Sequence, residues 1–329
     1  MHLDLMGSAS KIGGKAYNLR RLSELCQVPA FFVIAFSNAK EIDDELNQEI
    51  IKNEFIKRNF EVVAVRSSAN CEDEATASFA GMFHTVLGVK LPGLVEAIRE
   101  VLSSAKSERV TAYAKMHNLS NLDIRMSVII QKLVRSRVSG VCFSRSDSTP
   151  DFITIEACYG LGEALVSGKV TPDFYAIDRH TLNIQNKKIG YQSLQLELGS
   201  NAPEYRTVPF YLRASMKLSK SEIGIIARNA LKIERELEFP AADIEWAIED
   251  DDLYITQARP YTGFSTNDTL NLRVQDKGID KEQKITSTAS SDLSKEEVDR
   301  MQKDAEMRTA KEIQHRNEIE AKNIVDKPR

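Results

Sequence analysis

The segment DIEWAIEDDDLYITQARP carries charged and amide side chains in a pattern that suits phosphate and metal chemistry. Apolar and polar residues alternate on each side of the acidic run, which predicts two strands joined by a turn. A turn centred on Asp251 sets Glu245 opposite Gln257, and the same register sets Asp243 opposite Arg259. Carboxylate and amide oxygens suit magnesium, and a guanidinium suits phosphate. The alternative is a solvated face with a cross-strand ion pair.

A glycine pair near the start of the chain is a second candidate site for binding phosphate. In IGGKAYNL, Gly13 and Gly14 directly precede a predicted helix, and Lys15 falls in its first turn. Backbone N–H groups and the helix dipole attract anions at such a position, and the lysine adds a point charge. The segment is not a Walker motif, and plain loop geometry is the alternative.

The segment VAVRSSANCEDE combines an arginine with two hydroxyl side chains. Arg66 is followed by Ser67 and Ser68 at the predicted end of a buried strand, where all three could contact phosphate. The alternative is an arginine that pairs with the nearby Asp73. Further along, IEACYGLGEALVSGKVTPD places Glu156 at a predicted strand end.

The two glycines that follow Glu156, Gly160 and Gly162, shape the connection to the next segment. A carboxylate at that position could meet a ribose hydroxyl or a metal-bound water. The alternative is a strand-to-helix turn that needs glycine for its conformation.

These segments sit in a chain that alternates strand and helix signals from residue 1 to about 262, which predicts a mixed α/β (α+β) architecture. The predicted helices are GGKAYNLRRLSELCQ, LPGLVEAIREVLSSA, SERVTAYAKMHN and SEIGIIARNALKIEREL. The predicted strands are EVVAVRSSA, DIRMSVIIQKLV, SGVCFSR and DFITIEACYGLGE, with a further hairpin in PDFYAIDRHTLNIQNKK.

After Thr262 the chain becomes polar and poor in core residues. We expect a domain over residues 1–262, a poorly ordered linker over 263–293, a charged helix over 294–323 and a tail over 324–329. Ser294 with Glu297 three residues later is a capping-box pattern for that helix.

The composition of the 329-residue chain is that of an ordinary soluble protein, with 42% hydrophobic and 28% charged residues. The net charge of −4 lacks the excess of positive charge that is typical of proteins that bind nucleic acid. Four cysteines without metal or redox spacing predict reduced thiols. The N-terminal segment lacks a signal-peptide core, and no apolar run is long enough to span a membrane. We therefore expect a cytoplasmic protein that binds neither nucleic acid nor membrane.

Five segments, in order, resemble the nucleotide-binding domain of the phosphoenolpyruvate synthase and pyruvate phosphate dikinase family, which rifampicin phosphotransferases share. They are GGKAYNL, VAVRSSA.CEDE..ASFAGM, IIQKLV.S.VSGVCFS, IEACYGLGEALVSGKVTPD and DIEWAIED..LYITQARP. The resemblance covers residues 11–262. It implies an ATP-grasp-like fold in which two subdomains close over ATP and magnesium.

The resemblance also implies roles for the charged residues. Glu245 and Gln257 match the family's magnesium ligands, and Arg259 matches the arginine that steadies the transferring phosphoryl group. Lys15 and Arg66 match the residues that grip the ATP phosphates. Phosphoryl transfer depends mainly on positioning and charge neutralisation, which three cations and one divalent metal would supply.

The remaining candidates are assigned to the nucleotide itself. Gln131, in VIIQK, falls where the family lines the adenine pocket, and Glu156 and Glu163 fall in the segment that flanks the nucleotide. The other expected cofactor-binding residues are Gly13, Gly14, Ser67, Ser68, Gly160 and Gly162.

The chain also departs from the family. A complete enzyme passes the phosphoryl group to a histidine in a motif resembling GG..SHAA, and no such string occurs here. The pyruvate-binding barrel is also missing from the sequence. We therefore expect the ATP half of the reaction, completed by a separate chain that supplies the histidine or pyruvate-binding domain, or limited to binding and slow hydrolysis of ATP.

The tail carries a second resemblance. Residues 270–323 are similar to the end of the β-sandwich and the first lid helix of the seventy-kilodalton heat-shock chaperones. Two alternatives to the phosphotransferase hypothesis follow: a chaperone-related interaction protein that acts through its helical tail, and an inactive fusion fragment.

Overall fold

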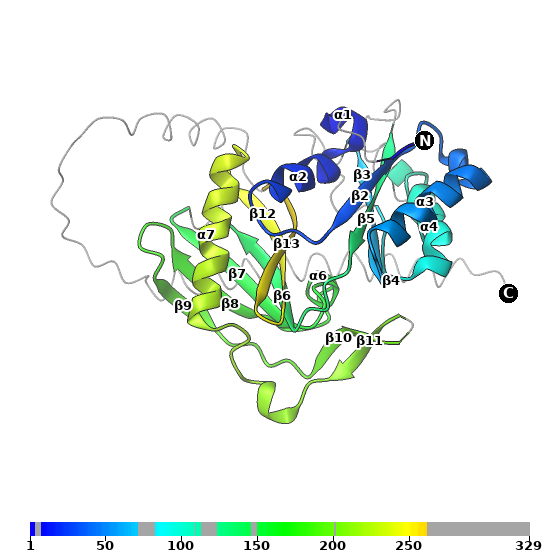
Figure 1. Ribbon diagram of the computed structural model, residues 1–329. Coiled ribbons are helices and arrows are strands. Elements are labelled where there is room, and N and C mark those ends of the chain that lie inside the picture. The colour runs from blue at the N-terminus through cyan, green and yellow to red at the C-terminus, as the bar shows by residue number, and fades with distance from the viewer. Residues whose placement is uncertain are drawn as a thin grey trace, which may run out of the picture.

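The computed structural model describes residues 1–3, 8–71, 83–108, 110–112, 124–145, 150–200 and 202–261. Two antiparallel sheets organise this part of the chain (Figure 1). The first sheet has the strand order β1-β2-β5-β3-β4 and the second β13-β12-β6-β7-β8-β9. The strands of the first sheet are β1 (His2–Leu3), β2 (Phe31–Ala35), β3 (Val63–Ala69), β4 (Thr85–Val89) and β5 (Met126–Lys132).

The first sheet buries one face under α3 (Glu45–Lys57) and α4 (Leu94–Ser104), together with the short 3-10 turns Ala39–Asp43 and Leu91–Gly93. Val63 and Val65 of β3 lie in that core. Because side chains alternate along a strand, Arg66 faces the opposite side of the sheet.

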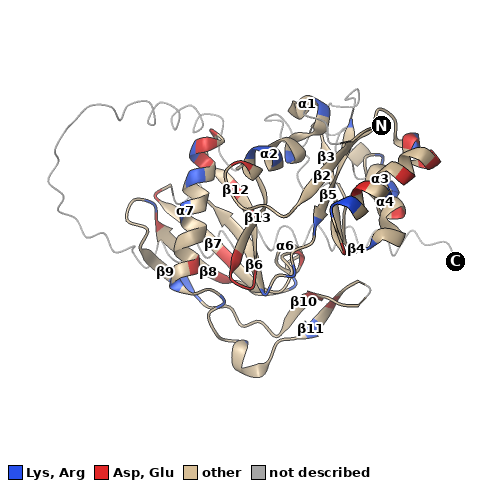
Figure 2. Cartoon of the chain, viewed as in Figure 1, with Lys and Arg blue, Asp and Glu red and all other residues tan. Residues whose placement is uncertain are grey.

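The helix α2 (Gly14–Ser23), which follows the short α1 (Ala9–Ile12), contacts strands of both sheets, β3 and β13. Its charged residues are all basic, as the blue segments of Figure 2 show: Lys15, Arg20 and Arg21. The helix therefore adds positive charge where the two sheets meet.

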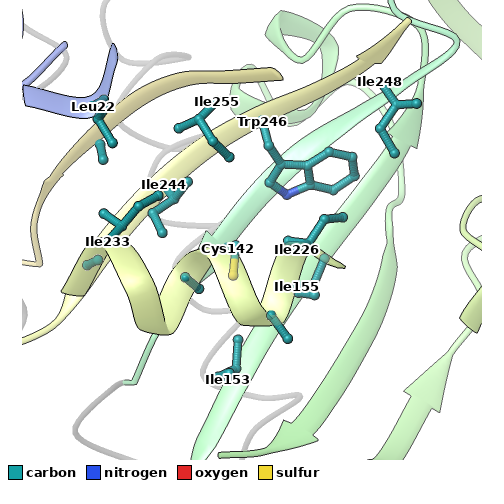
Figure 3. Packing of buried hydrophobic residues seen from close by; sticks show 14 of the residues in the cluster. Leu22, Cys142, Ile153, Ile155, Ile226, Ile233, Ile244, Trp246, Ile248 and Ile255 are labelled. Carbon is teal, nitrogen blue, oxygen red and sulfur yellow. The ribbon is translucent and has the colours of Figure 1, made fainter. Parts of the chain in front are cut away.

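The second sheet packs its apolar face against α7 (Lys220–Glu236), which begins with a capping box at Ser219 and Glu222. In Figure 3, Ile226 and Ile233 of α7 face Ile244 and Trp246 in one cluster. The strands of this sheet are β6 (Val138–Phe143), β7 (Phe152–Tyr159), β8 (Asp173–Asp178), β9 (Ile184–Lys188), β12 (Ala242–Glu249) and β13 (Asp252–Pro260).

The smaller elements lie around the second sheet. They are α6 (Glu163–Val166), β10 (Leu194–Leu198), β11 (Pro203–Thr207) and the 3-10 turn Phe210–Leu212. Fully buried Lys217 binds Asp173 of β8 at 2.6 Å and donates to the Gly190 carbonyl at 2.9 Å. The bond to Gly190 joins the two ends of the segment that carries the β10–β11 hairpin, and the bond to Asp173 fixes them to β8.

The mixed α/β class is confirmed, and the two sheets supply the two subdomains expected of an ATP-grasp-like fold. The predicted strands and hairpin are present, whereas SERVTAYAKMHN lies partly outside the described residues. The linker, the charged helix and the tail after residue 262 also lie outside them, so that boundary stays a prediction. Within the part of the chain that the structure covers, no helix is long and apolar enough to cross a membrane.

Candidate functional site

The β12–β13 hairpin has the predicted register at its four polar positions. Glu245 pairs with Gln257, and Asp243 pairs with Arg259. The Arg259 guanidinium binds the Asp243 carboxylate through Nε at 2.9 Å and through Nη2 at 2.8 Å. The predicted ion pair is present, and all four side chains belong to the sheet face that turns away from the core.

This register depends on a β-bulge that the sequence analysis did not predict. The turn holds only Asp250 and Asp251, because Glu249 pairs with Asp252, and pairing shifts by one residue between Glu245 and Trp246. Thr256 is the extra residue. Without the bulge, the two-residue turn would set Gln257 opposite a core-facing residue, so the bulge returns its amide to the polar face.

Arg66 reaches from β3 of the first sheet to this hairpin. Its Nη2 donates to Glu245 Oε2 at 2.7 Å and to Gln257 Oε1 at 3.1 Å. Its Nη1 donates to the Thr256 carbonyl and to Gln131 Oε1, both at 3.2 Å. Arg66 lies inside β3 and not at a strand end as predicted, and the structure shows it paired with Glu245, since sheet packing brings that distant carboxylate to it.

The Glu245 carboxylate stays ionised in this setting. Burial opposes its charge, yet the neighbouring Arg66 guanidinium, with smaller contributions from Arg259 and Lys15, lowers its pKa below the ordinary value. The side chain remains 32% exposed. Glu245 is therefore a charged and partly exposed carboxylate.

The donor set fits a magnesium ion that also binds phosphate. Glu245 Oε2 and Gln257 Oε1 converge on one cationic nitrogen, Arg66 Nη2. Magnesium prefers oxygen ligands and is bound by one or two carboxylates together with substrate phosphates. Among the described residues no cluster of three or more His, Cys, Asp or Glu could hold a metal by itself, and a magnesium ion here would take its remaining ligands from phosphate oxygens or water.

The glycine pair packs tightly against β3. Gly13 caps α2 with φ of +82°, and a Cβ there would lie 2.3 Å from Ser68 Oγ. The buried Ser68 hydroxyl donates to the Ile12 carbonyl at 2.8 Å and accepts from the Ala16 N–H at 3.0 Å. Ser68 thus fixes the start of α2, and only glycine fits at position 13.

Lys15 lies in the first turn of α2, where it was predicted. Its Nζ donates to the buried Ser67 hydroxyl at 3.4 Å, and Gly14 is the first residue of the helix. The helix start therefore holds an ammonium group next to β3, in the same electrostatic neighbourhood as Glu245.

The other candidates lie further along the second sheet. Glu156 is inside β7 and not at a strand end as predicted. Cross-strand pairing puts it in one row with Val141 and Glu245, on the same face and two strands (about 10 Å) from Glu245. Gly160 has a φ of +80° and Gly162 an ordinary helical φ of −61°, and Glu163 begins α6 in an exposed position.

The family model for the pyruvate phosphate dikinase AMP/ATP-binding domain matches residues 37–278. Gly13, Gly14 and Lys15 lie before this match, so their placement rests on the contacts above. A second model, Hsp70 protein, matches residues 264–328 outside the described residues, in agreement with the resemblance of the tail.

Curated relatives support the same family. A Bacillus subtilis protein named "Uncharacterized phosphotransferase YvkC" is 34% identical over 233 residues, which is 70% of this chain and 27% of that protein. A "Probable phosphoenolpyruvate synthase" of Methanothermobacter thermautotrophicus is 35% identical over 211 residues, or 63% of this chain and 31% of that protein. The chain thus spans less than a third of the length of these relatives.

Solved structures give a weaker likeness. D-alanine–D-alanine ligase from Bacillus anthracis aligns with a TM-score of 0.36 and 10% identity, over 79% of this chain and 65% of the ligase. D-alanyl-alanine synthetase A from Vibrio cholerae aligns with a TM-score of 0.40 and 9% identity, over 82% and 64%. The assignment rests on the matched sequence: the chain belongs to the pyruvate phosphate dikinase AMP/ATP-binding domain family.

Proposed function

We propose that this chain binds ATP with magnesium and transfers a phosphoryl group from ATP to a histidine supplied by another polypeptide or domain. The observation that carries the proposal is the convergence of Glu245 Oε2 and Gln257 Oε1 on the guanidinium of Arg66, between the two sheets. Two hard oxygens and a cation at one point are the groups that a metal–triphosphate needs.

The charges around this point support the assignment. Arg66 and Lys15 bind the phosphates, with the start of α2 directed toward the same anion. Glu245 and Gln257 hold the magnesium ion, which neutralises phosphate charge when bound. Arg259, held by Asp243 on the same sheet face, stabilises the charge on the transferring phosphoryl group.

The nucleoside occupies the polar face of the second sheet, beside Glu156 and the loop from Gly160 to Glu163. That face combines the carboxylates of Glu156 and Glu245 with partly exposed apolar side chains between them, such as Val141. A mixed apolar and polar surface of this kind suits a base and a ribose. Phosphoenolpyruvate formation, named for several relatives, would then depend on the partner that carries the histidine and the pyruvate site.

Calorimetric titration of ATP tests the proposal. We expect ATP binding to the purified chain that is tighter with magnesium than with a chelator. Glu245→Ala should remove the magnesium effect, and Arg259→Ala should leave binding largely intact while blocking phosphoryl transfer to an added histidine domain. Absence of ATP binding under both conditions contradicts the proposal.

A further inference from the structure

We infer that Gln131 is a positioning residue that aims Arg66 at the phosphate site, acting together with the Thr256 carbonyl exposed by the bulge. This inference rests on the proposed function and gives Gln131 a role other than contact with adenine. The three groups come from three strands of two sheets: β5, β3 and β13.

The contacts form a closed triangle. Gln131 Oε1 accepts from Arg66 Nη1 at 3.2 Å, and Gln131 Nε2 donates to the Thr256 carbonyl at 3.3 Å. The same carbonyl accepts from Arg66 Nη1 at 3.2 Å. The Gln131 side chain is only 2% exposed, and both ends of its amide are engaged. The amide therefore joins the arginine to the bulge.

The triangle leaves Nη2, the second terminal nitrogen of the Arg66 guanidinium, directed at the proposed phosphate site. With Nη1 held by Gln131 and Thr256, Nη2 points at Glu245 and Gln257. An arginine side chain has many rotamers, and a group fixed before binding loses less freedom when the ligand arrives. Gln131 and Thr256 thus prepare Arg66 for the triphosphate.

The bulge gives Thr256 this role through its backbone alone. β13 is the edge strand of its sheet and pairs with β12, and the extra residue of a bulge is left outside that ladder. Here the Thr256 carbonyl accepts two side-chain bonds from the first sheet. One irregularity therefore turns Gln257 toward the site and supplies the acceptor that orients Arg66.

A ligand that lacks adenine distinguishes the two possible roles of Gln131, which are positioning of Arg66 and contact with adenine. The experiment titrates Gln131→Met with Mg-ATP and with magnesium tripolyphosphate. We expect both affinities to fall by the same factor, about tenfold, as for a lost hydrogen bond to a charged group. Gln48→Met is the matched control, because Gln48 is a half-buried amide of α3 that donates to the Ile42 carbonyl, on the face of the first sheet opposite to Arg66. It should change neither affinity.

A double-mutant cycle completes the test. In an Arg66→Met background, Gln131→Met should have no further effect on either ligand. Deletion of Thr256 should weaken both ligands as Gln131→Met does, because it removes the carbonyl yet keeps Gln257 opposite Glu245. A loss confined to ATP, or additive effects of Gln131→Met and Arg66→Met, overturns the inference. A wild-type chain that binds neither ligand overturns the proposed function as well.

Discussion

Arg66 of the first sheet and Glu245 of the second form an ion pair at 2.7 Å. The two residues lie 179 positions apart in the sequence. In the proposed function, the pair joins a cation that would bind phosphate to a carboxylate that would bind the metal, and here each neutralises the other. Binding of a metal–triphosphate would then require both to exchange partners.

Replacement of Arg66 should therefore separate metal binding from nucleotide binding. Arg66→Met removes the cation on which Glu245 and Gln257 converge. We expect Mn²⁺ alone to bind about five- to tenfold more tightly, as for loss of one unit-charge repulsion near water. ATP should bind at least about tenfold more weakly because its phosphates lose a charged donor. Electron paramagnetic resonance measures the first effect and calorimetry the second.

The exposed Arg235→Met is the control for loss of one positive charge. It should alter neither titration. Unchanged Mn²⁺ affinity in Arg66→Met would show that the guanidinium does not compete with the metal for these oxygens.

Glu245→Gln should give the complementary result. The variant keeps the shape of the side chain and loses the charge that a magnesium ion needs. We expect ATP affinity in magnesium to fall at least about tenfold, and ATP affinity in a chelator to stay equal or rise, since a negative charge beside the phosphates is gone. Calorimetry in magnesium and in a chelator measures both, with the exposed Glu236→Gln as control. A parallel loss in both media would contradict a metal-specific role.

The hairpin illustrates what the sequence predicts well. The expected turn at Asp251 sets Glu245 opposite Gln257, and the structure has this pairing, although a two-residue turn and a bulge produce it. The bulge was missed because an extra residue in a strand need not carry a distinctive side chain. The number of residues in the hairpin indicates the bulge: with a two-residue turn, Glu245 can pair with Gln257 only if the second strand holds one extra residue.

Contacts between the two sheets could not be predicted. The acids nearest to Arg66 in sequence are Glu61 before β3 and Glu72 after it, whereas its partner in space is on β12, and nothing local to VAVRSSA indicates this. The burial of Gln131 is equally dependent on packing. For Glu156, the apolar run that follows it, Ala157 to Tyr159, continues the strand beyond the predicted end.

A buried acid on α7 should control stability at low pH. Glu234 binds Arg179 at 2.8 Å and Arg145 at 2.5 Å, linking the helix to the segments that follow β6 and β8. Burial opposes its ionisation, but the two arginines lower its pKa below the ordinary 4.5. Its stabilising contribution is therefore complete above the unfolded pKa and is lost as pH falls through the lower folded pKa.

Glu234→Gln should reduce the free energy of unfolding by about 3 kcal/mol at pH 7, because two arginines lose their shared partner in a buried site. The difference from the wild type should shrink below about pH 4.5. Urea unfolding followed by the fluorescence of Trp246, the single tryptophan and a fully buried one, measures both values. A difference that stays constant with pH would contradict this account of Glu234.

Two glycines from the predicted nucleotide-binding set should differ in how far alanine changes stability. At Gly13, φ is +82° and a Cβ would meet Ser68 at 2.3 Å, so Gly13→Ala must displace the start of α2. We expect a loss of about 2 kcal/mol in unfolding free energy together with weaker ATP binding. Gly162 has a helical φ, and its nearest Cβ neighbour would be Ser139 Oγ at 3.5 Å. Gly162→Ala should stay within about 0.5 kcal/mol of the wild type. Thermal unfolding and ATP calorimetry on both variants decide the point, and equal effects would show that close packing at Ser68 is not what requires Gly13.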